Sequence, residues 1–176
     1  MRRAGSSDRP TPALADSEQR RTRPSAHTVV PEAHRNAVIA HIMVDGTAAA
    51  IDFYTEAFGA EELFRIGSPD GRVVHAEVSV QGSRIMLGDA EGPYFSAPTT
   101  VGGTTVGLHV FVEDVDALAQ RAVAAGAELL QPPADQFHGD RTAILRDPSG
   151  HVWVFLTHVE DLTPEDIARR ARELLL

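Results

Sequence analysis

The sequence predicts an α+β protein built from two βαβββ modules and a C-terminal helix. The main observation is an internal repeat. His41-Ile-Met-Val-Asp opens one half and His109-Val-Phe-Val-Glu opens the other, and each half runs through an Ala-rich helical segment to a Gly-Ala-Glu triplet. Two copies are too few for a solenoid. They indicate a pseudo-twofold pair of modules with a ligand cleft where the modules meet.

The first module is predicted over residues 36–89. Gly59 is expected to end its helix as a C-cap, and Gln81-Gly82 is expected to turn its hairpin. The alternation and spacing of apolar residues predict a strand over 37–44, a helix over 46–58, and strands over 61–66, 72–80 and 84–87. Residues 89–105 are rich in Gly, Pro and Thr and are predicted to be a linker.

The second module is predicted over residues 106–158 and repeats this plan. Asp114 is placed to cap its helix. The predicted elements are a strand over 106–112, a helix over 115–125, a short strand over 128–130, a loop over 132–139, and strands over 141–146 and 151–157. The sequence Asp147-Pro-Ser-Gly150 is interpreted as the hairpin turn between the last two strands.

The two ends of the chain lie outside the folded domain predicted over residues 36–160. Residues 1–35 are Arg-rich without periodicity and are interpreted as a disordered extension. A basic nucleic-acid-binding arm, or a regulatory segment, is the alternative for them. Thr163-Pro164 predicts the start of a C-terminal helix within residues 161–176.

The charge of the chain excludes several kinds of partner. The formal net charge is −9, and residues 1–35 hold seven Arg against four acidic residues, so the remainder carries about −12. Such a domain is unsuited to nucleic acid and to anionic membranes. No apolar run approaches the roughly 20 residues of a membrane span, and no secretory signal is present, so a cytoplasmic location is expected.

The absence of Cys and of Lys narrows the chemistry further. Disulfides, thiol nucleophiles and lysine Schiff bases are excluded. No cofactor is required by the sequence. Any metal must be held by His, Asp or Glu, a donor set that suits iron, zinc, manganese or nickel.

Strand alternation gathers the candidate site residues on one face. In each of three predicted strands one side is purely apolar and is expected to pack under the module helices. The other sides carry His41, His75, Glu77 and His109, which are expected to line a cavity. Apolar Met43, Phe111 and Val154 lie on the same sides and are assigned, with His75 and Arg141, to substrate binding.

Three interpretations of these residues remain open. His41, Glu77 and His109 can form a two-His, one-carboxylate metal site. Glu77 can instead act as a metal-free general base assisted by His41 and His109. The third interpretation is that the His residues are hydrogen-bonded pocket residues without chemistry. Arg141 can hold a ligand carboxylate bidentately, or form an ion pair with Asp140 or Asp147.

Several segments across residues 36–158 resemble a known family. They are Ala50–Tyr54, Phe58–Ala60, Val112–Asp116, Ala124–Ala127 and Asp147–His151. In this order they resemble the modules of the vicinal-oxygen-chelate superfamily, which includes glyoxalase I, bleomycin-resistance proteins and extradiol dioxygenases. The segments His75–Glu77, Gly139–Arg141 and Gly150–Trp153 are similar to its glyoxalase-like bacterial branch.

The resemblance implies βαβββ modules curved as a mixed sheet around a central cavity, commonly in a homodimer. It places the family's four metal ligands at Ile39, Glu77, Gly107 and Val154, of which only Glu77 can coordinate. This departure argues against ordinary glyoxalase I activity. Metal-free members of the family sequester drugs or natural products in the same cavity.

Two functions follow as hypotheses. The first is a small-molecule-binding protein that sequesters a drug or natural product between its modules. The second is a lyase, isomerase or oxygenase acting on a small carbonyl or polyketide-like substrate, with a divalent metal or with Glu77 as the base.

Overall fold

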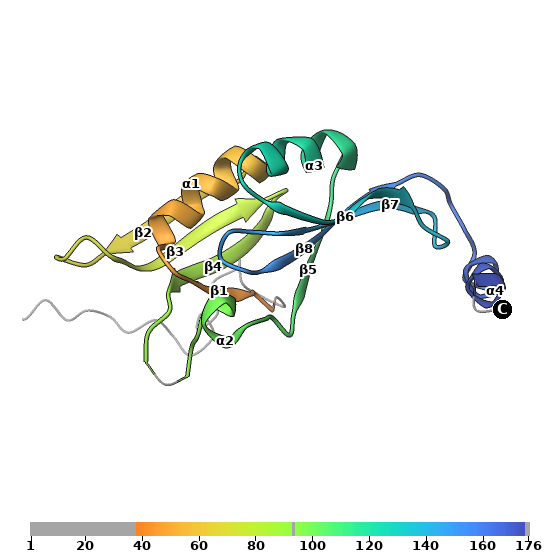
Figure 1. Cartoon of the computed structure of the whole chain (residues 1–176). Helices are drawn as coiled ribbons and strands as arrows, with labels where there is room; N and C mark the ends of the chain where they lie inside the picture. Colours follow the sequence, from red (N-terminus) through yellow and green to blue (C-terminus); the bar gives the residue numbers. More distant parts are fainter. Residues whose placement is uncertain (1–37, 93, 175–176) are drawn as a thin grey trace, which may run out of the picture. The chain divides into compact units, whose positions relative to one another are not determined.

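The computed structural model describes residues 38–92 and 94–174, and it contains two mixed sheets of four strands each (Figure 1). The predicted extension, residues 1–35, lies outside the described residues. The first module comprises β1 (His41–Val44), α1 (Thr47–Phe58), β2 (Glu61–Gly67), β3 (Val73–Val80) and β4 (Ser83–Asp89). The second comprises β5 (Gly107–Phe111), α3 (Val115–Ala124), β6 (Glu128–Asp135), β7 (Asp140–Arg146) and β8 (Val152–His158). A short helix α2 (Pro98–Val101) lies in the linker, and α4 (Pro164–Leu174) follows β8.

The two sheets have the same topology, which confirms the predicted pair of βαβββ modules. Sheet A has the order β1-β4-β3-β2 and sheet B the order β5-β8-β7-β6. In each sheet the first strand of the module pairs in parallel with the last, and the other pairs are antiparallel. The parallel pair needs a crossover connection, which α1 and α3 begin. None of the described helices is long and apolar enough to cross a membrane.

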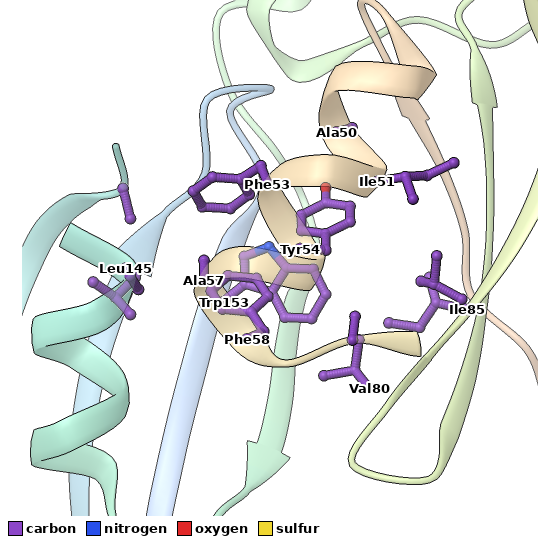
Figure 2. Close-up of a cluster of buried hydrophobic side chains, with 14 of the residues drawn as sticks. Ala50, Ile51, Phe53, Tyr54, Ala57, Phe58, Val80, Ile85, Leu145 and Trp153 are labelled. Atoms are coloured by element: carbon purple, nitrogen blue, oxygen red, sulfur yellow. The ribbon is translucent and has the colours of Figure 1, made fainter. Parts of the chain in front are cut away.

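One hydrophobic core serves both modules. Helices α1 and α3 lie side by side on one side of the two sheets (Figure 1), and Arg121 of α3 donates a hydrogen bond to the carbonyl of Ala57 at 2.9 Å. The rings of Phe58 and Trp153 lie 4.9 Å apart beneath the helices (Figure 2), so a helix of one module packs on a strand of the other. Tyr54, Phe58 and Trp153 are all core residues, since each is at most 1% exposed.

Asp147 is a buried carboxylate at the junction of the modules, although the sequence indicated only a turn. Its oxygens accept hydrogen bonds from Tyr54 Oη at 2.7 Å, from Trp153 Nε1 at 2.9 Å, and from the backbone N–H of His151 at 2.9 Å. Burial, and then the neighbouring charge of Asp147, raise the pKa of Tyr54 well above its ordinary value. The Asp147 carboxylate therefore fixes helix α1 against the β7–β8 turn.

The two module helices begin in different ways. The Asp114 side chain accepts a hydrogen bond from the N–H of Ala117 at 2.9 Å, which confirms the predicted cap of α3. Helix α1 starts after Gly46 without a cap from its own preceding residue. Asp89 at the end of β4 replaces that cap, because it accepts hydrogen bonds from the N–H of Thr47 at 2.7 Å and from its hydroxyl at 2.8 Å. A strand thus caps the helix that packs on it.

Two elements differ from prediction. β6 continues to Asp135 through Pro132 and Pro133, where a loop was predicted. Proline is tolerated there because β6 is the edge strand of sheet B, and its pairing with β7 is irregular between Gln131 and Ala134. The linker contains α2, which was not predicted. Its Pro98 lies against Gly150, where an added Cβ would come within 2.9 Å of the Pro98 Cβ.

Candidate functional site

The open face of sheet A, the face turned away from α1, carries four of the predicted residues. Glu77 and His41 both lie beside Met86 of β4 in the strand register, one on each side. The alternate residues of β3, Ala76 and Val78, are fully buried on the helix side. The predicted division of the strands into an apolar side and a site side is therefore confirmed in sheet A. The four residues on this face are His41, Met43, His75 and Glu77.

The Glu77 carboxylate is buried and paired. Glu77 is 4% exposed, Arg84 of β4 donates to its Oε2, and His75 Nε2 lies 3.6 Å from its Oε1. Burial of an unpaired carboxylate is costly, and the Arg84 guanidinium offsets that cost. Sequence reasoning missed Arg84. The hairpin turn at Gln81-Gly82 sets the register that pairs Arg84 with Ser79, on the same face as Glu77, so the signal was present.

Four rings form a row on the open face of sheet A. Phe64 and His75 have ring centroids 5.6 Å apart, His75 and His41 5.6 Å in an edge-to-face arrangement, and His41 and Phe95 6.2 Å. Partial burial, and then the neighbouring His75, lower the pKa of His41. Neutral imidazole therefore predominates at neutral pH. An aromatic row of this kind offers stacking surface to a flat ligand.

A pocket of about 600 Å³ lies between β1 and the start of β5, beneath the linker. Its wall is largely apolar, with His41 and Phe95 at one end of the ring row. The buried His151 also lines it and has its Nε2 2.9 Å from the carbonyl of Met43, which joins β1 to the second module. The remaining wall residues are Val38, Ala40, Ile42, Tyr94, Ser96, Pro98, Val101, Gly103, Thr104, Thr105, Val106 and Leu108. Sequence reasoning missed Tyr94, Phe95 and His151.

His109, Phe111 and Val154, which were also predicted to line the site, lie on sheet B. His109 pairs with Val154 in the register of β5 and β8, and both side chains point away from the core. The His109 ring lies beside Gly107, where an added Cβ would be 3.7 Å from Nε2. Phe111, at the end of β5, is 60% exposed and lines a different hollow. His109 and Phe111 therefore do not line the pocket that contains His41 and Met43.

The predicted metal set is not gathered within one chain. Among residues 38–92 and 94–174, no group of three or more His, Asp or Glu side chains is placed to hold a metal ion. His41 and Glu77 belong to sheet A and His109 to sheet B. Strand alternation predicted the correct face of each strand, but it contains no information on the separation of the two sheets.

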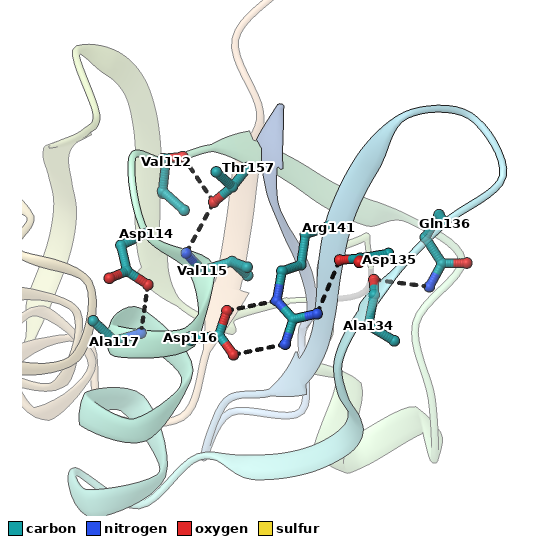
Figure 3. A network of polar contacts seen from close by, with 10 residues as sticks. All are labelled: Val112, Asp114, Val115, Asp116, Ala117, Ala134, Asp135, Gln136, Arg141 and Thr157. Atoms are coloured by element: carbon teal, nitrogen blue, oxygen red, sulfur yellow. Dashed lines mark hydrogen bonds and ion pairs between the residues drawn. The ribbon is translucent and has the colours of Figure 1, made fainter. Parts of the chain in front are cut away.

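Arg141 lies in a network of ion pairs that joins β7 to α3 and β6 (Figure 3). Its guanidinium binds Asp116 of α3 at 2.6 and 2.8 Å and Asp135 of β6 at 2.9 Å. Arg141 shares the helix-covered side of β7 with the fully buried Ala143 and Leu145, because strand residues alternate. The assignment of Arg141 to substrate binding is not supported by this position. Its ion-pair partners are also not the predicted Asp140 or Asp147.

A sequence model described as Glyoxalase/Bleomycin resistance protein/Dioxygenase superfamily matches residues 33–155. The chain belongs to this superfamily. Among curated proteins, it is 42% identical over 131 residues to uncharacterized protein Mb0911c of Mycobacterium bovis, covering 72% of this chain and 86% of that protein. The same identity and length are found for uncharacterized protein Rv0887c of Mycobacterium tuberculosis, of which 77% is covered.

Solved structures agree on the fold. TioX from Micromonospora sp. ML1 is 29% identical with a TM-score of 0.56, and the match covers 72% of this chain and 99% of TioX. The genomically encoded fosfomycin resistance protein FosX of Listeria monocytogenes is 17% identical with a TM-score of 0.53, covering 74% of this chain and 96% of FosX. At that identity FosX shows the fold alone.

The residues present do not fit the divalent metal that many members of this superfamily hold. Gly107 has no side chain, and the side chains of Ile39 and Val154 have no donor atom. The fourth position, Glu77, is engaged by Arg84 and His75. A metal would need a Glu77 carboxylate oxygen as a ligand, but Oε2 already faces Arg84 and Oε1 already faces His75.

Proposed function

We propose that this chain binds a small, flat, largely apolar or aromatic molecule and holds it without changing it. The observation that carries the proposal is the pocket of about 600 Å³ at the end of the Phe64–His75–His41–Phe95 ring row. The volume is in the range of small-molecule sites. The wall is largely apolar, and its His41 ring is largely neutral because the pKa of His41 is lowered.

Sequestration of a drug or natural product is the biological form of this proposal. The superfamily includes bleomycin resistance proteins, and FosX, which shares the fold, is a fosfomycin resistance protein. The predicted metal ligands are dispersed between two sheets, which favours retention of a ligand over metal-assisted turnover.

We further propose that two copies of the chain assemble with their open sheet faces toward one another. Phe64 and Ile66 on sheet A and Phe111 on sheet B are between 43% and 60% exposed. Large apolar side chains gathered on an open sheet face mark an interaction surface. A second copy would cover these side chains and enclose the bound molecule.

The test is a calorimetric titration of the full chain with three flat aromatic probes, quinoline, acridine and anthraquinone. Replacement of Phe95 by Ala should weaken binding of the best probe by about tenfold, since an aromatic contact contributes roughly 0.5–1.5 kcal/mol beyond its buried area. The matched control is Phe137→Ala, because Phe137 is also exposed but contacts His138 edge to face, outside the pocket. Equal affinities of the two variants, or no heat with any probe, would count against the proposal.

One observation favours catalysis as a second candidate. His75 Nε2 lies 3.6 Å from the buried Glu77 carboxylate, an arrangement that a proton-transferring lyase or isomerase can use. If Glu77 is the base, Glu77→Gln should abolish conversion of a carbonyl substrate while His109→Gln leaves it intact. Metal analysis of the freshly purified chain, before and after dialysis against a chelator, separates this version from the oxygenase hypothesis, which requires a stoichiometric divalent metal.

A further inference from the structure

The segment after β8 forms a separate attachment to sheet B. We call residues Val159–Leu174 the C-terminal arm. The N–H groups of Val159 and Glu160 both donate to the carbonyl of Gly139, at 3.0 and 2.9 Å. Gly139 has a φ of +94°, and an added Cβ would come within 2.4 Å of the Glu160 carbonyl oxygen. Only glycine leaves room for the arm at this crossing.

The helix of the arm has few contacts of its own with the sheets. No residue of α4 is buried, and the helix lies beyond the β6–β7 end of sheet B (Figure 1). Arg170 holds the helix to the start of the arm through two hydrogen bonds to Glu160, at 2.7 and 2.8 Å. Since an isolated helix of this length is marginal in water, its position depends on the few contacts at the start of the arm.

His158 is the histidine among those contacts. Its Nδ1 lies 2.9 Å from Asp140 Oδ1 at the start of β7, and its Nε2 lies 2.9 Å from Asp161 Oδ1 in the arm. Carboxylates only accept hydrogen bonds, and neutral imidazole has one N–H. Only the doubly protonated ring can donate to both carboxylates. The neutral ring leaves a lone pair facing an oxygen at one of them.

The surroundings of this ring are acidic. Asp140 also accepts from His138 Nδ1 at 3.1 Å, so one half-buried carboxylate lies between two imidazoles. Glu160, which also lies near this ring, interacts with the charges of Arg170 and Asp166. The titratable groups that line the hollow around His158 are His138, Asp140, Glu160 and Asp161.

We propose that His158 is a pH-dependent clasp that holds the C-terminal arm on sheet B while its ring is protonated and loosens the arm when the ring becomes neutral. The hollow beneath the clasp, about 430 Å³, is lined by the apolar side chains of Phe111, Leu162 and Ile167. Loosening of the arm exposes this surface at the end of β5. The arm is therefore a regulated cover over part of the open face of sheet B.

The direction of the pH effect follows from the contacts. The hydrogen bonds with Asp161 and then Asp140 raise the pKa of His158 above its ordinary value of 6.5. A raised pKa in the docked state means that docking is favoured below 6.5 and is progressively lost as the pH rises through the docked-state pKa. We therefore expect the midpoint for release of the C-terminal arm to lie above pH 6.5.

A single spin label tests the clasp in the full chain. The chain has no cysteine, so Glu165→Cys at the exposed first turn of α4 provides one labelling position. The immobile fraction of the label should fall by about twofold or more from about pH 5.5 to about pH 8.5, the range in which histidine titrates. His158→Gln in the labelled chain should remove this transition, and His138→Gln should keep it. An unchanged label mobility, or a transition that survives His158→Gln, would overturn the proposal.

Two further measurements separate the clasp from a general loss of structure. Fluorescence of Trp153, the single tryptophan, reports the core and should not change across the same pH range. Gly139→Ala should make the arm mobile at every pH, because its Cβ displaces Glu160. NMR titration of His158 should show a pKa that falls on Asp161→Asn, and a pKa that does not move would equally reject the clasp.

Discussion

Asp147 shows how one buried residue joins the two halves of the molecule. Its carboxylate accepts from the Tyr54 hydroxyl in α1 and from the Trp153 indole in β8. The two donors come from different modules, one from helix α1 and one from strand β8. A carboxylate placed there contributes to the pairing of the modules.

Replacement of Tyr54 by Phe should therefore destabilise the chain without affecting ligand binding. A hydrogen bond to a charged group contributes roughly 1.5–3 kcal/mol, and the free energy of unfolding should fall by about 2 kcal/mol. Urea unfolding followed by circular dichroism measures the change. The native chain should also lose stability above about pH 10, where an ionised tyrosine would face Asp147. A variant as stable as the native chain would show that Asp147 is satisfied without the tyrosine.

The individual site residues show what alternation along a strand can and cannot predict. It assigned His41, His75 and Glu77 to the face of sheet A away from the helix, where the structure places them. Alternation by itself did not indicate that Arg84 neutralises Glu77, because that pair follows from the cross-strand register that the hairpin turn sets. It also did not predict the partners of Arg141, whose guanidinium binds Asp116 of α3 and Asp135 of β6.

Helix α1 depends on strand β4, which ends at Asp89 beside the first turn of the helix. Asp89 accepts two hydrogen bonds from Thr47, and Gly46 provides no side chain for the purpose. The β4 strand and α1 are therefore coupled, and loss of either should weaken the other.

Asp89→Ala should lower the free energy of unfolding by about 1 kcal/mol, the usual contribution of a helix cap. Burial alone would raise the pKa of Asp89, but hydrogen bonds from Thr47 hold it below 3.8. The stabilisation is thus present above pH 3.8 and is lost as the pH falls through the lower folded-state pKa. The denaturant midpoints of the native chain and of Asp89→Ala, measured at about pH 7 and at about pH 3, check this. The difference in midpoint between the two proteins should be smaller at the lower pH. A constant difference would assign the effect to packing alone.

Most elements were predictable because their ends have local signals. Gly59 ends α1 with a φ of +69°, and Gln81 and Gly82 turn the β3–β4 hairpin with φ values of +49° and +78°. The extent of β6 was not predictable, since Pro132 and Pro133 indicate a loop wherever the strand's position in the sheet is unknown. Edge position is a property of the tertiary fold.

The two open sheet faces are the part of the molecule where large apolar side chains remain exposed to solvent. The repeat predicted two modules and the core shows how their helices pack. The repeat did not indicate whether the two site faces meet within one chain. His41 and His109 remain on separate sheets, and the residues for which the sequence predicted a shared metal form no such group within the described part of the chain.

Assembly through these faces should be measurable. Phe64→Glu should shift the chain from dimer to monomer in sedimentation velocity, because a charge replaces an aromatic ring at the proposed interface. Val123→Glu is the matched control, since Val123 is also 43% exposed but lies on α3, on the other side of the sheets. A native chain that sediments as a monomer, or equal behaviour of both variants, would contradict the proposed assembly.

The paired prolines of β6 limit how copies of this chain can associate. A proline nitrogen has no hydrogen to donate, and because N–H groups alternate in direction along a strand, one of Pro132 and Pro133 removes a donor from the outer rim of sheet B. An incoming strand finds no continuous ladder to extend there, and fibrous growth from that rim is discouraged. The face-to-face assembly proposed above does not use this rim, because the exposed rings of Phe64 and Phe111 lie on the open sheet faces.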